Sequence, residues 1–229
     1  MTDPGDLPAL VRHQLDALGA VPRTIARLGG LRGGRGYRVR HPGGALIVKR
    51  TTRPAEPHLY RTLAPALARR GIGLPALAWA GRDGAGWWLI LEDIPAPLPG
   101  ERRLADPAAL AMLRRLHTGA LAPADLPRDG YHPAWTARLD ELALAALPPD
   151  ARGPLAPLLA GLREDNQALF APTCPIHGDP NPANWGLRFD GSLVLYDWER
   201  LTLGTPALDL AITVPGLGDD AAYRRVAAA

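Results

Sequence analysis

The sequence predicts an α+β protein in two parts: a small N-terminal lobe with an antiparallel β-sheet and one helix, and a larger, mainly helical C-terminal lobe. Short apolar segments separated by turn residues, with one leucine-periodic segment among them, continue to about residue 92. A Pro/Gly-rich connector, IPAPLPG, begins at Ile94, and segments of helical period follow it. We therefore expect lobes over residues 1–94 and 95–229.

The N-terminal lobe is expected to begin with a helix whose apolar residues recur at helical spacing and whose end is marked by Gly19. Two hairpins should follow, because apolar segments flank the turn sequences HPGG and RDGAG. Pro54 can begin a helix between them, and Gly71 can end it. In chain order, the predicted elements are a helix over 7–19, strands over 35–40 and 45–50, a helix over 54–70, and strands over 76–80 and 87–92.

The C-terminal lobe is expected to be helical with one hairpin. Asp106 followed by proline is typical of a helix start, and Asp190–Gly191 between two short apolar segments predicts a hairpin turn. In chain order, the predicted elements are helices over 106–118, 133–147 and 154–170, strands over 185–189 and 193–196, and a last helix starting near Pro206.

The composition narrows the class of protein. With 229 residues, 47% of them hydrophobic, the chain can bury a core without disulfide bonds or metals. The single cysteine, Cys174, excludes an internal disulfide and favours a reducing compartment. No apolar segment approaches the roughly 20 residues needed to span a bilayer, and the first residues do not resemble a signal peptide. We therefore expect a cytoplasmic protein with no membrane partner.

The charge is divided unevenly along the chain. Residues 1–100 contain 14 basic and 7 acidic side chains, whereas residues 101–229 contain 12 basic and 16 acidic side chains. A uniformly basic surface would indicate nucleic acid, and we expect no such partner here. The asymmetry instead suggests that the first half binds an anion and the second half binds cations. Simple scatter of charge along the sequence is the alternative.

The densest chemical signal is HGDPNPAN, over residues 177–184, followed by Asp197 at the end of a predicted strand. Asp179 can accept a proton from a hydroxyl group, and Asn184 and Asp197 offer oxygen atoms suited to Mg²⁺. An Asp, an Asn five residues later and a second Asp after a strand follow the order of residues used in phosphoryl transfer. An ordinary turn rich in Asp, Asn and Pro is the alternative.

Lys49 is the second signal, because it is the one lysine among 26 basic residues and it ends the apolar segment ALIVK. A lysine ammonium is a compact charge that can hold phosphate groups. In phosphoryl-transfer enzymes such a lysine is paired with a glutamate of the next helix, and Glu56 occupies the start of that predicted helix. The alternatives are a solvated surface lysine and an acid that favours a helix N-terminus.

A glycine-rich segment, GGLRGGRG over residues 29–36, precedes the strand GYRVR. Glycines such as Gly33 and Gly34 allow backbone amides to approach a phosphate closely. The spacing is not that of a Walker P-loop, and a plain loop is an equally good interpretation.

HGDPNPANWG followed by LVLYDWERLTLGTPALDLA resembles the aminoglycoside phosphotransferase and choline-kinase-like superfamily of small-molecule kinases. The resemblance extends upstream through the glycine-rich segment, IVK, AEPHLYRTLA and WLILEDI, and covers about residues 24–211. It implies a bilobal, protein-kinase-like fold and transfer of the γ-phosphate of ATP, with Mg²⁺, to a hydroxyl of a small molecule.

The resemblance also implies a role for each matching residue. Asp179 would be the catalytic base, and Asn184 and Asp197 would hold Mg²⁺. Lys49 would bind the α- and β-phosphates of ATP, with Glu56 holding it in place. The ATP-binding set is completed by Gly33, Gly34 and the backbone from Glu92 to Ile94, which would meet adenine; His177 and Asp209 would brace the catalytic loop, and Glu199 would lie near the metal or the acceptor.

Two features of the sequence differ from many members of that superfamily. Asn181 stands where many have His or Lys, and only 20 residues follow Asp209, so residues 120–170 would supply most of the acceptor site. That segment is acidic, which suits an aminated acceptor. The alternative is that these acidic side chains lie on solvated helix faces and bind nothing. Two other functions stay open from the residues: a nucleotide-binding pseudokinase or regulatory module, and a metal-dependent phosphohydrolase.

Overall fold

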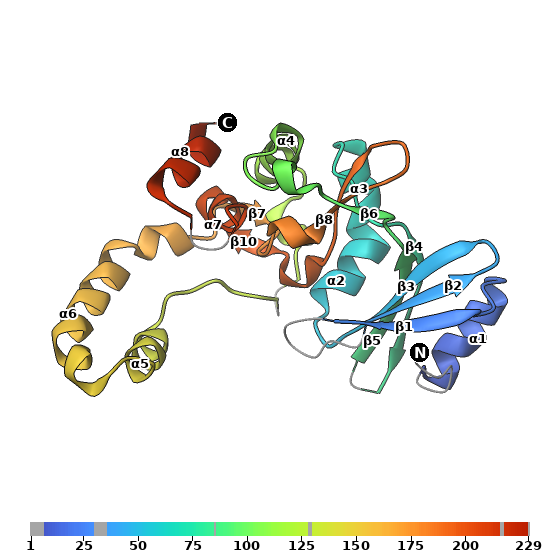
Figure 1. Ribbon diagram of the computed structural model, residues 1–229, viewed down its shortest axis with the longest axis horizontal. Coiled ribbons are helices and arrows are strands. Elements are labelled where there is room, and N and C mark those ends of the chain that lie inside the picture. The colour runs from blue at the N-terminus through green and yellow to red at the C-terminus, as the bar shows by residue number, and fades with distance from the viewer. Residues whose placement is uncertain (1–6, 30–35, 85, 128–129, 216–217, 229) are drawn as a thin grey trace.

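The computed structural model describes residues 7–29, 36–84, 86–127, 130–215 and 218–228, and its N-terminal lobe is a five-stranded antiparallel sheet (Figure 1). The strand order is β1-β2-β3-β5-β4, which places β3 at the centre. The strands are Thr24–Leu28 (β1), Gly36–His41 (β2), Gly44–Thr51 (β3), Leu77–Asp83 (β4) and Gly86–Glu92 (β5).

Both predicted N-terminal hairpins are present, with one strand and one turn that differ from the prediction. Strand β1 was not predicted, because Ile25 is its one buried residue and so gives little apolar alternation. His41 pairs directly with Gly44, so the connection has two residues instead of four. Gly44 has a φ of 136°, a conformation open to glycine but rarely adopted by other residues, which explains why glycine can close this turn.

Two helical segments cover the sheet. Ala9–Ala17 (α1) buries Val11 and Leu15 in a cluster with the sheet residues Val39 and Val48. The helix predicted between the hairpins consists of Ala55–His58 (α2), a π-helical turn over Leu59–Leu63, and Ala64–Arg69 (α3). Pro65 cannot donate a backbone hydrogen bond to residue 61, so an undisturbed α-helix is not available at this point.

The C-terminal lobe contains the predicted hairpin and helices, together with three short strands and a terminal helix that were not predicted. Its strands form two small sheets, one of order β6-β8-β9 and one of order β10-β7. The elements are Ala96–Pro97 (β6), Pro107–His117 (α4), Ala137–Ala145 (α5), Pro149–Asp165 (α6), Cys174–Ile176 (β7), Trp185–Leu187 (β8), Leu193–Leu195 (β9), Thr202–Gly204 (β10), Pro206–Ile212 (α7) and Asp220–Ala228 (α8).

The prediction placed the start of α6 at Pro154, but the helix begins at Pro149. Pro154 and Pro157 both lie inside it, where proline usually marks a boundary. The helix has no fully buried residue, and Figure 1 shows α5 and α6 projecting from the rest of the C-terminal lobe, at the opposite end of the molecule from the β1–β5 sheet.

One hydrophobic core crosses from lobe to lobe. It joins Leu59 and Leu67 of the N-terminal helical segment to Leu113 of α4 and Leu195 of β9. The backbone also crosses here, since Leu195 N donates to the Gly73 carbonyl at 3.0 Å. A Cβ on Gly73 would lie 2.1 Å from the Leu193 carbonyl oxygen, so only glycine permits this approach. This junction fixes the two lobes on either side of the candidate site.

Among the described residues, we find no helix that combines the length and apolar character needed to cross a membrane.

Candidate active site

Lys49, Glu56 and Asp197 meet between the two lobes. Lys49 Nζ lies 3.0 Å from Oε1 and 2.9 Å from Oε2 of Glu56, and it also donates to Asp197 Oδ1. Glu56 is completely buried, while the side chains of Lys49 and Asp197 are 22% and 40% exposed. The central strand, the first turn of the following helix and a C-terminal loop therefore bring together three residues that the sequence analysis had singled out.

The two carboxylates keep Lys49 charged. Burial alone lowers the pKa of this ammonium, but the charges of Glu56 and Asp197 and their hydrogen bonds outweigh burial and raise the pKa above its ordinary value. A permanently charged ammonium at this position, partly open to solvent, is suited to binding an anion such as a phosphate group.

Asn184 and Asp197 flank the open end of the β8–β9 hairpin. Trp185 pairs with Leu195, and Tyr196 N donates to the Asn184 carbonyl at 3.0 Å, so Asn184 and Asp197, which follows Tyr196, lie at the same end of the hairpin. Asp197 has a left-handed backbone conformation, with a φ of 67° and a ψ of 55°. Such a conformation is uncommon outside glycine, is tolerated by aspartate, and occurs often at functional sites.

Asp179 lies in the loop that precedes this hairpin, and its carboxylate has two side-chain partners. Asn181 Nδ2 donates to Oδ1 at 2.9 Å, and Arg200 Nη1 lies 3.4 Å from Oδ2. Asn184 Nδ2 donates to the Asp179 backbone carbonyl at 2.8 Å, which ties the base candidate to the metal-ligand candidate. The Asp179 side chain is 27% exposed, so a small molecule can reach it.

His177 and Asp209 brace this loop, as the resemblance implied. The buried Asp209 carboxylate of α7 accepts hydrogen bonds from the backbone N–H groups of His177 and Gly178, both at 2.8 Å, and contacts His117 Nε2 at 2.9 Å. Gly178 has a φ of 82°, and a Cβ there would lie 2.6 Å from the Arg200 carbonyl oxygen. The HGD sequence therefore needs glycine at its centre for steric reasons.

His177 is fully buried behind Asp179. Burial lowers the pKa of the His177 imidazole, even though nearby carboxylates oppose this effect. Its Nδ1 accepts a hydrogen bond from the Asp179 N–H at 3.2 Å, and its ring meets that of Trp198 edge to face at 4.5 Å. A neutral His177 thus supports the backbone of Asp179.

Contact of the other predicted ATP-binding residues with a nucleotide stays a prediction. Gly33 and Gly34 lie outside the described residues. The Glu92 carboxylate binds Arg188 at 2.7 and 2.8 Å, which lowers the pKa of Glu92 and links β5 to the C-terminal hairpin. A Cβ on Gly186 would lie 2.6 Å from Ile94 Cγ2, so Ile94 packs against β8. The side chains of this connector therefore join the lobes.

Three residues near Asp179 were missed by the sequence analysis. The Arg200 guanidinium lies 5.4 Å from the Tyr131 ring centroid, and that of Arg53, from the N-terminal lobe, lies 5.8 Å from the same ring. Tyr131 therefore contacts a cation from each lobe beside the catalytic loop. Arginine is the usual cation throughout this chain, so nothing in the sequence marked these two.

Two of the acidic side chains in residues 120–170 already have partners within this segment. Asp140 is buried, accepts a hydrogen bond from Trp135 Nε1 at 2.6 Å and pairs with Arg163 at 2.9 Å. Glu141 pairs with Arg138 on the surface of α5. These two carboxylates stabilise the α5–α6 region itself.

Asn184 and Asp197, at the open end of the hairpin, offer oxygen atoms of the kind that Mg²⁺ binds. Asn184 uses Nδ2 for the Asp179 carbonyl and keeps its amide oxygen, while Asp197 uses Oδ1 for Lys49 and, among the described residues, leaves Oδ2 without a hydrogen bond. One amide and one carboxylate oxygen form a donor set of the kind used for Mg²⁺ that is shared with phosphates. The described residues contain no cluster of three His, Cys, Asp or Glu side chains able to hold a metal alone.

Comparisons with known proteins show which family and which solved structures this chain matches. A family model described as a phosphotransferase enzyme family matches residues 24–229. An aminoglycoside-3'-phosphotransferase of type VIII is 27% identical, with a TM-score of 0.58 over 96% of this chain and 92% of that chain. Choline kinase LicA from Streptococcus pneumoniae is 15% identical, with a TM-score of 0.66 over 96% of this chain and 78% of that chain. An aminoglycoside phosphotransferase from Streptomyces rimosus is 22% identical, with a TM-score of 0.58 over 97% and 92% of the two chains.

Proposed function

The chain belongs to the phosphotransferase enzyme family, and we propose that it transfers the γ-phosphate of ATP to a hydroxyl group of a small molecule. The observation that carries this proposal is the meeting of Lys49 and Asp197 from different lobes, next to the loop that holds Asp179. A phosphate-binding cation, a metal-binding carboxylate and a proton acceptor are thereby available to one bound nucleotide and one acceptor.

Each residue has a defined task in the proposed reaction. Lys49, held by Glu56, binds the α- and β-phosphates of ATP. Asp179 accepts the proton of the acceptor hydroxyl. The hydroxyl oxygen of the acceptor bonds to the γ-phosphorus of ATP, and the bond from that phosphorus to the bridging oxygen of ADP breaks. Mg²⁺, held by Asn184 and Asp197, would supply positive charge to the phosphate oxygens.

Positioning contributes most of the rate in this kind of reaction, since the enzyme needs no covalent intermediate. The hydrogen bonds from Asn181 to Asp179 and from Asn184 to the Asp179 backbone serve that purpose. Arg200 Nη1 lies 3.4 Å from Asp179 Oδ2 and helps to hold this carboxylate in position.

We infer further that the acceptor carries an amine. The excess of acidic side chains in residues 101–229 supports this proposal, as does the presence of Glu199 on the loop that contains Asp197. A cationic acceptor would be attracted to this part of the molecule, whereas the nucleotide would meet the basic first half.

The experiment that tests the function is an assay of ADP release with ATP, Mg²⁺ and a panel of hydroxylated acceptors. The panel includes aminoglycosides, choline-like amines, amino alcohols and neutral sugars. We expect ADP release that depends on one acceptor class and a phosphorylated product of matching mass. Hydrolysis of ATP that no acceptor accelerates would contradict the proposal and favour a phosphohydrolase, and nucleotide binding without turnover would favour a regulatory module.

A further inference from the structure

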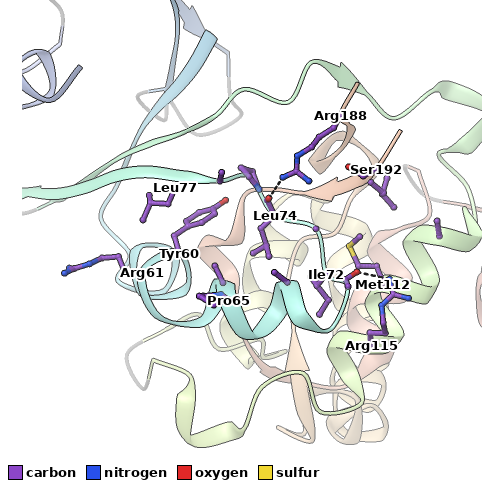
Figure 2. Close-up of a pocket in the computed structure, with 18 residues that line it drawn as sticks. Tyr60, Arg61, Pro65, Ile72, Leu74, Leu77, Met112, Arg115, Arg188 and Ser192 are labelled. Carbon is purple, nitrogen blue, oxygen red and sulfur yellow. Dashed lines mark hydrogen bonds between the residues drawn. The ribbon is translucent and has the colours of Figure 1, made fainter. Parts of the chain in front are cut away.

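A surface cavity of about 890 Å³, open to solvent on one side, is lined by residues other than those of the candidate active site (Figure 2). Its walls come from the helical segment over 60–68, the connection over 71–77, helix α4 and the β8–β9 turn. None of the catalytic or phosphate-binding candidates lines it. We propose that this cavity is a second ligand site, which binds a small amphiphilic anion: an apolar body with a carboxylate head.

The volume and the apolar lining support a small-molecule site. Pockets that bind small molecules usually have volumes of about 300–1,000 Å³ and are largely apolar. Here Ile72, Leu74, Leu77 and Met112 provide aliphatic and thioether surface, and small residues of α3 leave the space open. Figure 2 shows these side chains around the cavity and the sulfur atom of Met112 on its α4 side.

Arg115 provides the charge of this site that an anion can use. Arg61, Arg115 and Arg188 are among the lining residues, and none of these residues is Asp or Glu. The Arg61 guanidinium lies 5.7 Å from the Trp87 ring centroid, and Figure 2 shows it extending away from the other lining side chains. Arg188 is neutralised by Glu92 from behind, whereas Arg115 donates one hydrogen bond, from Nη2 to the Gly71 carbonyl at 3.0 Å. A guanidinium has five N–H donors, so Arg115 retains donors for a carboxylate.

Tyr60 provides the second polar feature of the site. This residue lines the cavity and is 4% exposed, and its hydroxyl has no hydrogen-bond partner within the described part of the chain. Figure 2 shows the ring extending from the helical segment toward Leu74, with Leu77 on its other side. Buried hydroxyl groups in proteins normally have partners, so an unpaired hydroxyl here indicates that a ligand oxygen can occupy the position.

The backbone at this wall is also unusual. Tyr60 and Arg61 both belong to the π-helical turn over Leu59–Leu63. Such turns are rare and occur frequently at functional sites. Tyr60 and Arg61 are the fourth and fifth residues after Glu56, and Figure 2 shows Tyr60 extending toward Leu74 and Arg61 extending away from it. The cavity and the nucleotide side are therefore separated by a single helical segment.

Calorimetric titration with decanoate tests the proposal, with decanol as the uncharged control of the same chain length. Ala68→Trp fills the cavity from α3, and Ala221→Trp makes the same exchange on the exposed face of α8, which does not line the cavity. Arg115→Gln removes the charge, and Arg114→Gln is its neighbour outside the cavity. Thermal unfolding verifies that each variant is folded.

We expect one decanoate per chain and binding at least about tenfold weaker for decanol. Arg115→Gln and Ala68→Trp should weaken decanoate binding about tenfold or more, while Arg114→Gln and Ala221→Trp should leave it unchanged. A saturating amount of ATP with Mg²⁺ should not displace decanoate. Equal binding to all variants, equal binding of decanol, or displacement by ATP would overturn the proposal. Because the titration needs no turnover, its result is independent of the proposed kinase activity.

Discussion

Asp179 is the residue on which the proposed proton transfer depends. Asp179→Asn keeps the size of the side chain and removes its ability to accept the proton. We expect kcat to fall about 10²–10⁴-fold while the affinity for ATP stays near that of the wild type. Steady-state kinetics with the best acceptor, together with nucleotide titration, measure both quantities. Full acceptor-dependent turnover by this variant would show that another group is the base.

His177 gives the stability a dependence on pH whose direction follows from its burial. The folded state keeps this imidazole neutral, whereas the unfolded chain binds a proton below a pH of about 6.5. The free energy of unfolding should therefore decrease as the pH falls from about 7 to 5, by at most about 1.4 kcal/mol per pH unit for this one group.

The matched variant for this prediction is His177→Asn, whose amide oxygen can accept the Asp179 N–H in place of Nδ1. Urea denaturation at several pH values gives the slope for both proteins. We expect the slope between pH 5 and 7 to be smaller in the variant, whatever its absolute stability. Identical slopes would mean that His177 is not the titrating group.

Sequence reasoning singled out residues with a distinctive chemical role; the structure brings several of them together, and the roles assigned to them stay predictions. Lys49 was singled out because it is the one lysine, and Asp179, Asn184 and Asp197 because their order is specific; the structure joins Lys49 directly to Asp197 and Asn184 to the Asp179 backbone. Tyr131 was missed, because its contacts with Arg53 and Arg200 join segments far apart in the sequence and leave no local pattern.

Whole elements were predictable where their local signals were strong. Asp106 accepts a hydrogen bond from Ala109 N at 2.9 Å, as expected for the cap of α4, and Gly71 ends the N-terminal helical segment with a φ of 70°. Strands β7 and β10 have three residues each and form because distant segments pair, so no periodicity announces them.

Helix α7 acts on the site through Asp209, which joins it to the catalytic loop and to α4. In Asp209→Asn, an amide nitrogen would face the backbone N–H groups of His177 and Gly178, which donate to the carboxylate in the wild type. We expect the free energy of unfolding to fall by about 1–3 kcal/mol, because buried donors lose their partner. Asp150→Asn, at an exposed position of α6, is the control and should change stability by less than about 0.5 kcal/mol. Urea denaturation measures the free energy of unfolding of both variants. Equal stability of the two would contradict the bracing role of Asp209.

At the scale of the whole molecule, contacts between the lobes hold the site together. Besides Lys49 and Asp197, Arg53 and Tyr131 meet across the lobes. Removing both cation–ring contacts in Tyr131→Ala should lower kcat/KM about five- to thirtyfold, since each contact contributes about 0.5–1 kcal/mol at an exposed site. Tyr131→Phe retains the ring and should stay close to the wild type. Similar losses in both variants would assign the effect to the hydroxyl group instead.

The charge asymmetry between the halves of the chain leads to a prediction about the acceptor. Asp140 and Glu141 are already paired with arginines, so attraction of an amine depends on the carboxylates that remain, among them Glu199 on the loop beside Asp197. A close pair between an amine and a carboxylate gains roughly 1–4 kcal/mol before desolvation, and salt screens this attraction over about 10 Å at 0.1 M ionic strength.

The KM of an aminated acceptor should therefore rise with ionic strength, by about threefold or more between roughly 0.05 and 0.5 M, while the KM of its neutral hydroxyl analogue stays nearly constant. Paired measurements on one amine and its analogue test this directly. Because both molecules present the same hydroxyl to Asp179, a preference for the neutral analogue together with a flat KM for the amine would show that the acidic helices are solvated surfaces and take no part in acceptor binding.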